Sequence, residues 1–318
     1  MNMQFHSHWR RQLQAFIDFR QTYFTSKWPG RTLVLFDRYA TQHPHLAFDA
    51  AVTAWLRRER KVTSITRSND LIAVRQFCLY RRRFAPDSFV PESLVPARSV
   101  RSRFRPFLPS HAQIKAILAE IPKLPGPPLR HARLRALFLV LYCTGLRSGE
   151  ALRLRLADVD LRHAYFRIGP SKGRVRLVPF HRDLARELQH WLMLRRRAAF
   201  VLTPRTPLFE REDGRPESKW NTWAQLSKLF HRCGLKPARG HGRGGMRVHD
   251  LRHLFAVQRL QRWYRAGCNP GPLLPWLSAY LGHVNLIGTE RYLHAAPLTL
   301  TIAARRFRHS LGFNPANP

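Results

Sequence analysis

The chain of 318 residues is poor in cysteine, in acidic side chains and in long apolar runs. It contains four cysteines, none in a C-x-x-C pair, which excludes a disulfide framework and leads us to expect reduced thiols. The longest apolar run, Ala136–Cys143, is too short to span a bilayer. The first residues lack the apolar core of a signal peptide. We therefore expect a cytoplasmic protein with no membrane partner.

The scarcity of acidic residues leaves a large positive charge. There are 19 Asp and Glu against 55 Lys and Arg, a net charge of +36. A solvated basic surface is the simplest explanation, but so much charge repels itself unless a polyanion neutralises it. Nucleic acid does so and gains affinity by counterion release. Basic residues occur along the whole chain, which favours a protein that wraps its polyanion over one with a single basic arm.

The apolar pattern divides the chain into three parts. Residues 1–90 carry apolar side chains at spacings of three and four, which predicts a helical domain. Residues 91–109 are rich in proline and arginine, which predicts an extended linker. Helical patterns resume in residues 110–318. The linker is either a plain tether or a basic strap along a DNA backbone. As a strap it would contact the DNA through four arginines: Arg98, Arg101, Arg103 and Arg105.

One β-hairpin interrupts the helices of the third part. Residues 163–168 and 174–179 alternate apolar and polar side chains on either side of a turn at 169–173 that includes Lys172. Residues 158–160 read as a turn before the hairpin. We therefore predict a mainly α protein with a small antiparallel β-sheet and two domains, an N-terminal helical domain and a C-terminal domain.

The segment Thr144–Glu150 has the features of a junction between two helices. Gly145 suits the end of a buried helix, and Ser148 suits an N-cap. Arg147 needs a partner at such a place, and Glu150 lies three residues later, within reach on one helical face. A structural salt bridge is the alternative to a functional arginine.

The segment 248–294 gathers two histidines, an arginine and a tyrosine at suggestive spacings. His249 and Arg252 share one helical face, and Tyr292 follows His283 by nine residues. His249 and His253 stand four apart as in the zinc motif H-E-x-x-H, but Asp250 replaces its glutamate and no third ligand has a matching spacing. The glycines of residues 240–245 lack the G-x-x-x-x-G-K-[ST] pattern of a nucleotide cradle. We expect neither metal nor cofactor, and a structural His253.

Three motifs in this order resemble those of the tyrosine recombinases, the phage integrase family. They are T-G-L-R-S-G-E at 144–150, H-D-L-R-H at 249–253, and L-G-H at 281–283 followed by Tyr292. Lys172 in the hairpin is a looser match. The resemblance covers roughly residues 110–300, and Leu254 departs from it where a threonine is common. Residues 1–90 stand where the family has its helical core-DNA-binding (SAM-like) domain.

The resemblance implies a role for each residue of these motifs. Arg147 and Arg252 would clamp the scissile phosphate, with Glu150 supporting Arg147. His249 and His283 would add hydrogen bonds, and His249 would help take the tyrosine proton. Lys172 would protonate the leaving 5′-oxygen, and Tyr292 would attack as the nucleophile.

The function implied is site-specific recombination of double-stranded DNA through a 3′-phosphotyrosyl intermediate, without metal or ATP. It further implies a homotetramer on paired DNA sites, alone or with related recombinases, in the nucleoid. A mobile genetic element and its integration or transposition are the expected context. The alternatives are a catalytically silent DNA-binding subunit and a type IB topoisomerase-like relaxing enzyme. The histidine at His283, where a lysine would otherwise stand, and the two-domain size favour the recombinase.

Overall fold

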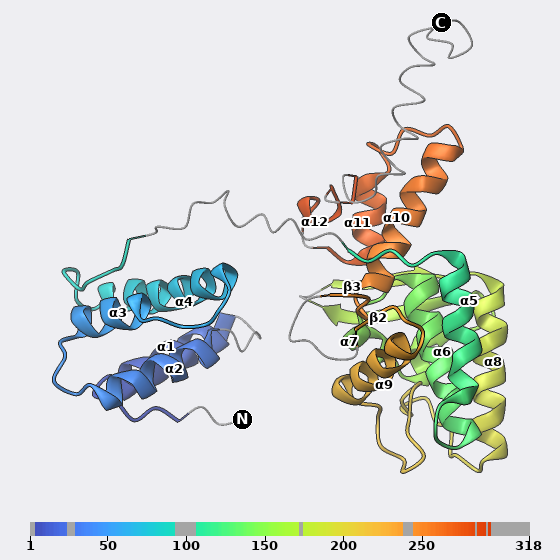
Figure 1. The fold of residues 1–318 in the computed structure, drawn as a ribbon, viewed down its shortest axis with the longest axis horizontal. Coiled ribbons are helices and arrows are strands. Elements are labelled where there is room, and N and C mark those ends of the chain that lie inside the picture. The colour runs from blue at the N-terminus through green and yellow to red at the C-terminus, as the bar shows by residue number, and fades with distance from the viewer. Residues whose placement is uncertain are drawn as a thin grey trace, which may run out of the picture. The chain divides into compact units, whose positions relative to one another are not determined.

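A computed structural model of the chain describes residues 4–23, 29–92, 106–171, 174–237, 244–283, 285–290 and 292–293, without the side chains of residues 170, 171 and 174. The chain divides into two compact units, residues 1–104 and 105–318 (Figure 1). Most of the expected linker and the hairpin residue Lys172 lie outside the described residues. So do residues 298–311, whose sequence predicts a terminal helix.

The N-terminal unit is helical, as its apolar spacing predicts. It contains α1 (Arg10–Tyr23), α2 (Gly30–Gln42), α3 (Phe48–Arg57) and α4 (Ser64–Arg82). Thr63 caps α4 by accepting a hydrogen bond from the backbone N–H of Thr66. The helices enclose an aromatic core in which Phe36 and Trp55 are fully buried and meet edge to face.

The helices of the C-terminal unit surround a second and larger core. They are α5 (His111–Glu120), α6 (Pro128–Thr144), α7 (Ser148–Ala151), α8 (Arg182–Arg197), α9 (Lys219–Arg232), α10 (Asp250–Arg265), α11 (Leu274–Leu281) and α12 (Ile287–Glu290), with short 3₁₀ turns at Ile121–Lys123 and Leu156–Asp158. Ser110 begins α5 with a capping box to Gln113. Helix α6 is buried on most of its surface, as its apolar sequence predicts, and packs against α8 and α10.

The sheet has three antiparallel strands in the order β1 (Val159–Asp160), β2 (Tyr165–Ser171) and β3 (Arg174–Pro179). Phe166 faces Val178 across the β2–β3 pair, and both side chains are fully buried, which fixes the register of the hairpin. The turn predicted at residues 158–160 is wrong, because Val159 and Asp160 pair with β2. Two residues are too few for an alternating pattern to reveal a strand.

The last described elements form a small cluster of their own. Apolar residues of α10 and α11 pack around Tyr292, which is 2% exposed. Within the described ranges, no helix combines the length and apolar character needed to cross a membrane.

Candidate active site

The end of α6 brings the first motif into position. Gly145 caps this helix in the left-handed conformation, with φ of 62°. A Cβ atom there would lie 2.8 Å from the ring of Phe255 on α10, so glycine is needed for both conformation and space. The chain thus turns sharply against α10, and the Gly145 carbonyl faces the second motif.

Arg252 is held inside the protein by main-chain carbonyls. Its Nη1 donates to the Gly145 oxygen at 2.9 Å, and its Nη2 donates to the Leu281 oxygen at 2.7 Å. The residue is 2% exposed. Burial, followed by the positive charge of Arg147, lowers the pKa of Arg252 to about 10. The guanidinium stays charged at neutral pH and is fixed in orientation.

Arg147, like Arg252, lies at the C-terminal end of α11. Its Nη2 donates to the Gly282 oxygen at 3.1 Å, and its Nη1 donates to Oε1 of Glu150 at 2.9 Å. The predicted N-cap of α7 is off by one residue: Arg147 occupies that position, and its backbone N–H donates to Glu150 Oε2 at 3.0 Å. The two motif arginines therefore converge on consecutive carbonyls at the C-terminus of α11, where the helix dipole favours positive charge.

A third arginine, Arg176 on β3, joins the pair and has no counterpart among the predicted residues. Its Nη2 donates to Glu150 Oε2 at 2.9 Å, and its Nε donates to the Tyr280 oxygen at 2.9 Å. Burial acts to raise the pKa of Glu150, but hydrogen bonds and charge from Arg176 and Arg147 outweigh it, so this pKa is lowered. One buried carboxylate thus orients two arginines.

Two of the predicted histidines are neutral at pH 7 in this setting. Burial, then the charges of Arg252 and Arg147, lower the pKa of His283 to about 4. Burial and Arg252 lower the pKa of His249 to about 4 as well. The His249 imidazole packs edge to face on His253, and part of the residue reaches solvent. The nearby arginines disfavour its charged form whether or not the ring is fully desolvated.

His283 has a second partner that the sequence does not reveal. Its Nδ1 lies 2.6 Å from Oγ1 of Thr289, a fully buried residue of α12. Its ring stacks on Tyr292 with the centroids 6.2 Å apart. Thr289 therefore sets the orientation of the imidazole beside the tyrosine.

The hydroxyl of Tyr292 lies 3.1 Å from Nδ1 of His253. His253 is 6% exposed, and its ring lies 5.4 Å from the tyrosine ring. The sequence predicts a structural role for His253. Its position four residues after His249 is the signal in the sequence that both histidines face one site.

The structure brings together Arg147, Glu150, His249, Arg252, His283 and Tyr292 from the predicted set. Lys172 and the linker arginines lie outside the described residues, so their roles remain predictions. In the same described part of the chain, no group of three or more His, Cys, Asp and Glu side chains could hold a metal ion.

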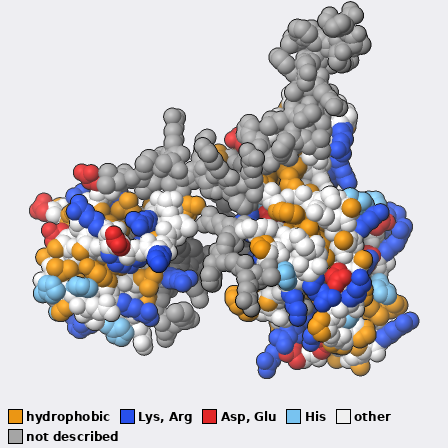
Figure 2. Space-filling view, in the orientation of Figure 1, with side chains coloured by type: hydrophobic (Ala, Val, Ile, Leu, Met, Phe, Trp, Pro, Cys, Tyr) orange, Lys and Arg blue, Asp and Glu red, His pale blue; other side chains and the backbone are white. Residues whose placement is uncertain are grey.

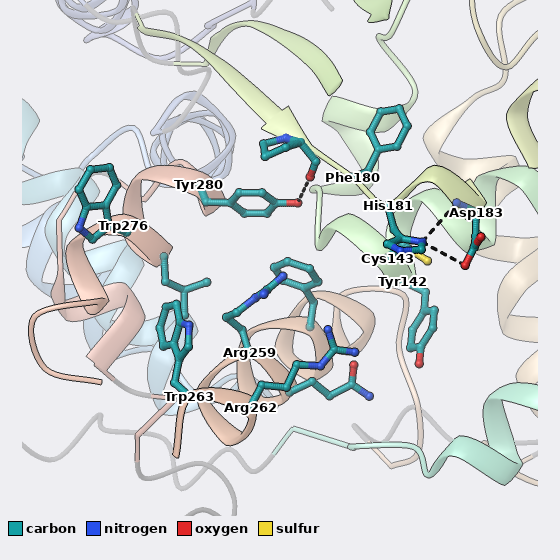
Figure 3. Close-up of a pocket in the computed structure, with 14 residues that line it drawn as sticks. Tyr142, Cys143, Phe180, His181, Asp183, Arg259, Arg262, Trp263, Trp276 and Tyr280 are labelled. Atoms are coloured by element: carbon teal, nitrogen blue, oxygen red, sulfur yellow. Dashed lines mark hydrogen bonds and ion pairs between the residues drawn. The ribbon is translucent and has the colours of Figure 1, made fainter. Parts of the chain in front are cut away.

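A separate groove of about 850 Å³ is lined in part by Tyr280 and Phe255, whose rings stack. Figure 3 shows Arg259 and Arg262 of α10 and Trp276 and Tyr280 of α11 around it. None of the described predicted residues lines this groove. This groove is therefore distinct from the cluster of arginines and histidines.

That cluster is suited to bind a phosphate diester. Arg147 and Arg176 share the carboxylate of Glu150, and Arg252 adds a third guanidinium, so positive charge remains. The neutral histidines can each supply one hydrogen bond. A buried tyrosine hydroxyl lies beside them. The arrangement can stabilise an anion and present an oxygen nucleophile to it.

Comparison with known proteins agrees with this chemistry. The phage integrase family matches residues 109–298. An integrase/recombinase of Sinorhizobium fredii, y4rB, is 33% identical over 94% of this chain and 97% of its own length. The tyrosine recombinase XerC of Roseiflexus sp. is 28% identical over 74% of this chain and 70% of its own.

Solved structures share the fold at low identity. The Tn1549 transposon integrase in complex with transposon right end DNA superposes with a TM-score of 0.64 at 17% identity, over 93% of this chain and 99% of that one. The XerH recombinase bound to its difH substrate gives 0.63 at 20% identity, over 92% and 83%. With its motifs converging in one cluster and the family match covering more than half its length, this chain belongs to the phage integrase family of tyrosine recombinases.

Proposed function

We propose that this protein is a site-specific recombinase of the integrase and transposase type, which breaks and rejoins DNA through a 3′-phosphotyrosyl bond to Tyr292. The observation that supports this most is the convergence of Arg147 and Arg252 on the end of α11, with His283 and Tyr292 stacked beside it. A protein that only binds DNA has no need of this arrangement.

The two arginines act on the charge of the reaction. Attack on a phosphodiester builds negative charge on the non-bridging oxygens, and fixed guanidiniums stabilise that charge without reorganisation. Arg252 is buried and doubly anchored, whereas Arg147 retains a side chain that is 37% exposed. Arg252 therefore serves as the rigid half of the clamp, and Arg147 as the half open to the incoming DNA.

The histidines complete the phosphate site. His249 and His283 are neutral before DNA arrives, and a bound phosphate would offset the arginine charge that lowers each pKa. Each then donates a hydrogen bond to a phosphate oxygen.

Tyr292 attacks phosphorus, and the bond to the 5′-oxygen breaks. Phenols have a pKa of about 10, so the arginine charge that surrounds Tyr292 favours the attacking phenolate. Lys172 gives its proton to the departing 5′-oxygen. The phosphotyrosyl bond retains the energy of the broken diester, so the exchanged strand can be rejoined without ATP, and the arginines supply the charge that a metal would otherwise provide.

The partner is double-stranded DNA, bound by a homotetramer across two sites, alone or with related recombinases. Figure 2 displays Lys and Arg side chains over the visible face of each unit, with fewer Asp and Glu. Residues 1–90 serve as the core-DNA-binding domain and residues 110–318 as the catalytic domain. If residues 91–109 act as a basic strap and not as a plain tether, Arg98, Arg101, Arg103 and Arg105 contact the DNA backbone.

Covalent trapping tests the proposal directly. Nicked duplexes cut from the DNA that flanks the gene are incubated with the protein, with EDTA and without ATP, and resolved in SDS. We expect an adduct with wild type and none with Tyr292→Phe. Tyr280→Phe is the matched control, because it removes a hydroxyl that bonds only the Pro179 carbonyl in the interactions described, and it should retain the adduct.

The outcomes separate the alternatives. Tight DNA binding without an adduct on any flanking duplex would favour a silent DNA-binding subunit. An adduct that forms on arbitrary sequences and relaxes supercoils, without pairing of sites, would favour a relaxing enzyme. Cross-linking on paired duplexes counts the protomers, and a dimer as the largest species would contradict the tetramer.

A further inference from the structure

The nearest described partner of the Tyr292 hydroxyl is His253, a residue outside the motif positions given a role above. Nδ1 of His253 and the tyrosine oxygen are 3.1 Å apart, within hydrogen-bond distance. Both residues are almost fully buried, at 6% and 2% exposure. A contact between two such side chains is fixed by the packing of α10 against the segment after α12 and is not a chance meeting on the surface.

The other two histidines are placed for different partners. The His283 imidazole meets Tyr292 by stacking, while its Nδ1 faces Thr289. His249 contacts the edge of the His253 ring, with centroids 4.7 Å apart. Of the three imidazoles around the site, His253 is the one with a nitrogen directed at the nucleophilic oxygen in the described interactions.

We propose that His253 is a further catalytic residue, the acceptor of the Tyr292 proton during cleavage. The proposal rests on the function given above, in which Tyr292 is the nucleophile. As the tyrosine oxygen bonds to phosphorus, its O–H bond breaks and the proton passes to Nδ1, giving an imidazolium. The bond from phosphorus to the 5′-oxygen breaks, and that oxygen takes a proton from Lys172.

The same residue serves the return reaction. When a 5′-hydroxyl attacks the phosphotyrosyl phosphorus, its proton passes to the neutral Lys172, and the bond from phosphorus to the tyrosine oxygen breaks. The imidazolium returns its proton to that departing oxygen, as microscopic reversibility requires. The proposal demands one tautomer of the resting enzyme, with hydrogen on Nε2 and a lone pair on Nδ1.

The surroundings of His253 make the proton transfer depend on DNA. Arg252 precedes it in the chain, and the charge of Arg252 interacts with Tyr292. An imidazolium formed next to this guanidinium is unfavourable in the free protein. A phosphate in the clamp supplies the compensating negative charge, so the proton transfer to His253 is favoured once the substrate is bound.

Single-turnover cleavage of a nicked duplex that forms the wild-type adduct tests this role. His253→Asn places an amide where Nδ1 lies, so it keeps a hydrogen-bonding group but accepts no proton. We expect its cleavage rate to fall by about 10²- to 10⁴-fold, the usual share of general acid–base catalysis, at unchanged DNA affinity. The matched control is His131→Asn, because His131 is a half-buried histidine of the same unit whose Nε2 meets only the Leu124 carbonyl in the interactions described.

Chemical rescue distinguishes proton transfer from packing. His253→Ala leaves a cavity that added imidazole can fill, and imidazole should restore cleavage, whereas pyrazole has the same size and far lower basicity and should not. Cleavage by His253→Asn within about threefold of wild type, or equal rescue by both azoles, would overturn the proposal. Failure of wild type to form any adduct would instead count against the function of Tyr292 itself.

Discussion

Glu150 and Arg176 are joined by two hydrogen bonds, from Nη2 to Oε2 at 2.9 Å and from Nη1 to Oε1 at 3.3 Å. They lie on α7 and β3, 26 residues apart in the chain. Because Glu150 also accepts from Arg147, one carboxylate couples the hairpin to the first motif. Through Arg176, which does not belong to the motifs, the sheet therefore contributes to the orientation of the proposed phosphate clamp.

Replacing Glu150 by glutamine should destabilise the protein and slow cleavage. The side chain is 1% exposed, so the change leaves two arginine charges without their buried counter-charge. We expect a loss of about 2–3 kcal/mol in the free energy of unfolding, measured with urea near neutral pH. Glu187→Gln is the control, because its pair with Arg135 is partly exposed and should contribute less than about 1 kcal/mol.

The effect of Glu150→Gln should also depend on pH. The folded pKa of Glu150 lies below its ordinary value of 4.5, so the unfolded chain binds its proton first on acidification. The stabilisation is complete above that ordinary value and is lost as the pH falls through the lower folded pKa. The stability difference between wild type and variant should shrink there, and a difference constant with pH would contradict the charge argument.

Gly282→Ala should harm catalysis more than stability alone explains. Gly282 has φ of 67°, and an added Cβ would lie 2.6 Å from Nη1 of Arg176. That guanidinium cannot move aside without losing Glu150 and the Tyr280 carbonyl. We expect cleavage to slow by roughly tenfold to a hundredfold, because the clamp is displaced.

Gly214→Ala is the matched control for this substitution. Gly214 has φ of 74° with nothing within 4 Å of an added Cβ, so it has the same left-handed backbone without the clash. It should cost about 1 kcal/mol of stability and leave cleavage unchanged. If both variants slow cleavage equally, backbone strain, and not the contact with Arg176, explains the effect at Gly282.

The sequence predicted the elements and the motif residues better than the contacts between them. Helix α6, its glycine cap and the hairpin follow from local patterns, and so does the pair of Arg147 with Glu150. Arg176, Thr289 and the bond from His253 to Tyr292 do not, because each depends on packing between segments far apart in the chain. A chain with 55 basic residues gives no local reason to single out Arg176.

The lowered histidine pKa values predict acid sensitivity. The folded pKa values of His249 and His283 are about 4, against the ordinary 6.5. Between these values the unfolded chain binds protons that the native state does not, so stability falls as the pH drops from 6.5 towards 4. His283→Gln should make that fall shallower in urea titrations, whereas His111→Gln, on the exposed start of α5, should not.

DNA should reverse the histidine shift. A bound phosphate favours the imidazolium, so the pKa of His283 should rise when a duplex occupies the clamp. Nuclear magnetic resonance of ring-labelled histidine measures this in wild type with and without DNA. An unchanged His283 titration in a saturated complex would place the phosphate elsewhere.

Lys172 can be tested through the leaving group. Lys172→Ala should slow cleavage by about 10²- to 10⁴-fold on an ordinary duplex, because the 5′-oxygen leaves poorly without a proton. A duplex with sulfur at the bridging 5′ position has a leaving group that needs no proton, so the variant should recover on it. Lys123→Ala, which removes a surface charge paired with Glu120, should behave as wild type on both duplexes. An equal defect on both substrates would exclude Lys172 as the general acid.

The linker arginines should appear in the salt dependence of binding. If Arg98, Arg101, Arg103 and Arg105 each neutralise a phosphate, replacing all four by serine should reduce the slope of log affinity against log salt by up to about 3.6, since each contact contributes about 0.9. Fluorescence anisotropy with a labelled duplex at several salt concentrations measures the slope.

The control makes the same replacement at four exposed arginines of α8, which removes equal charge: Arg182, Arg186, Arg196 and Arg197. Phosphate contact by the linker predicts a much smaller change for the α8 variant, whereas equal slopes would mean that net charge alone governs affinity and that residues 91–109 are a plain tether.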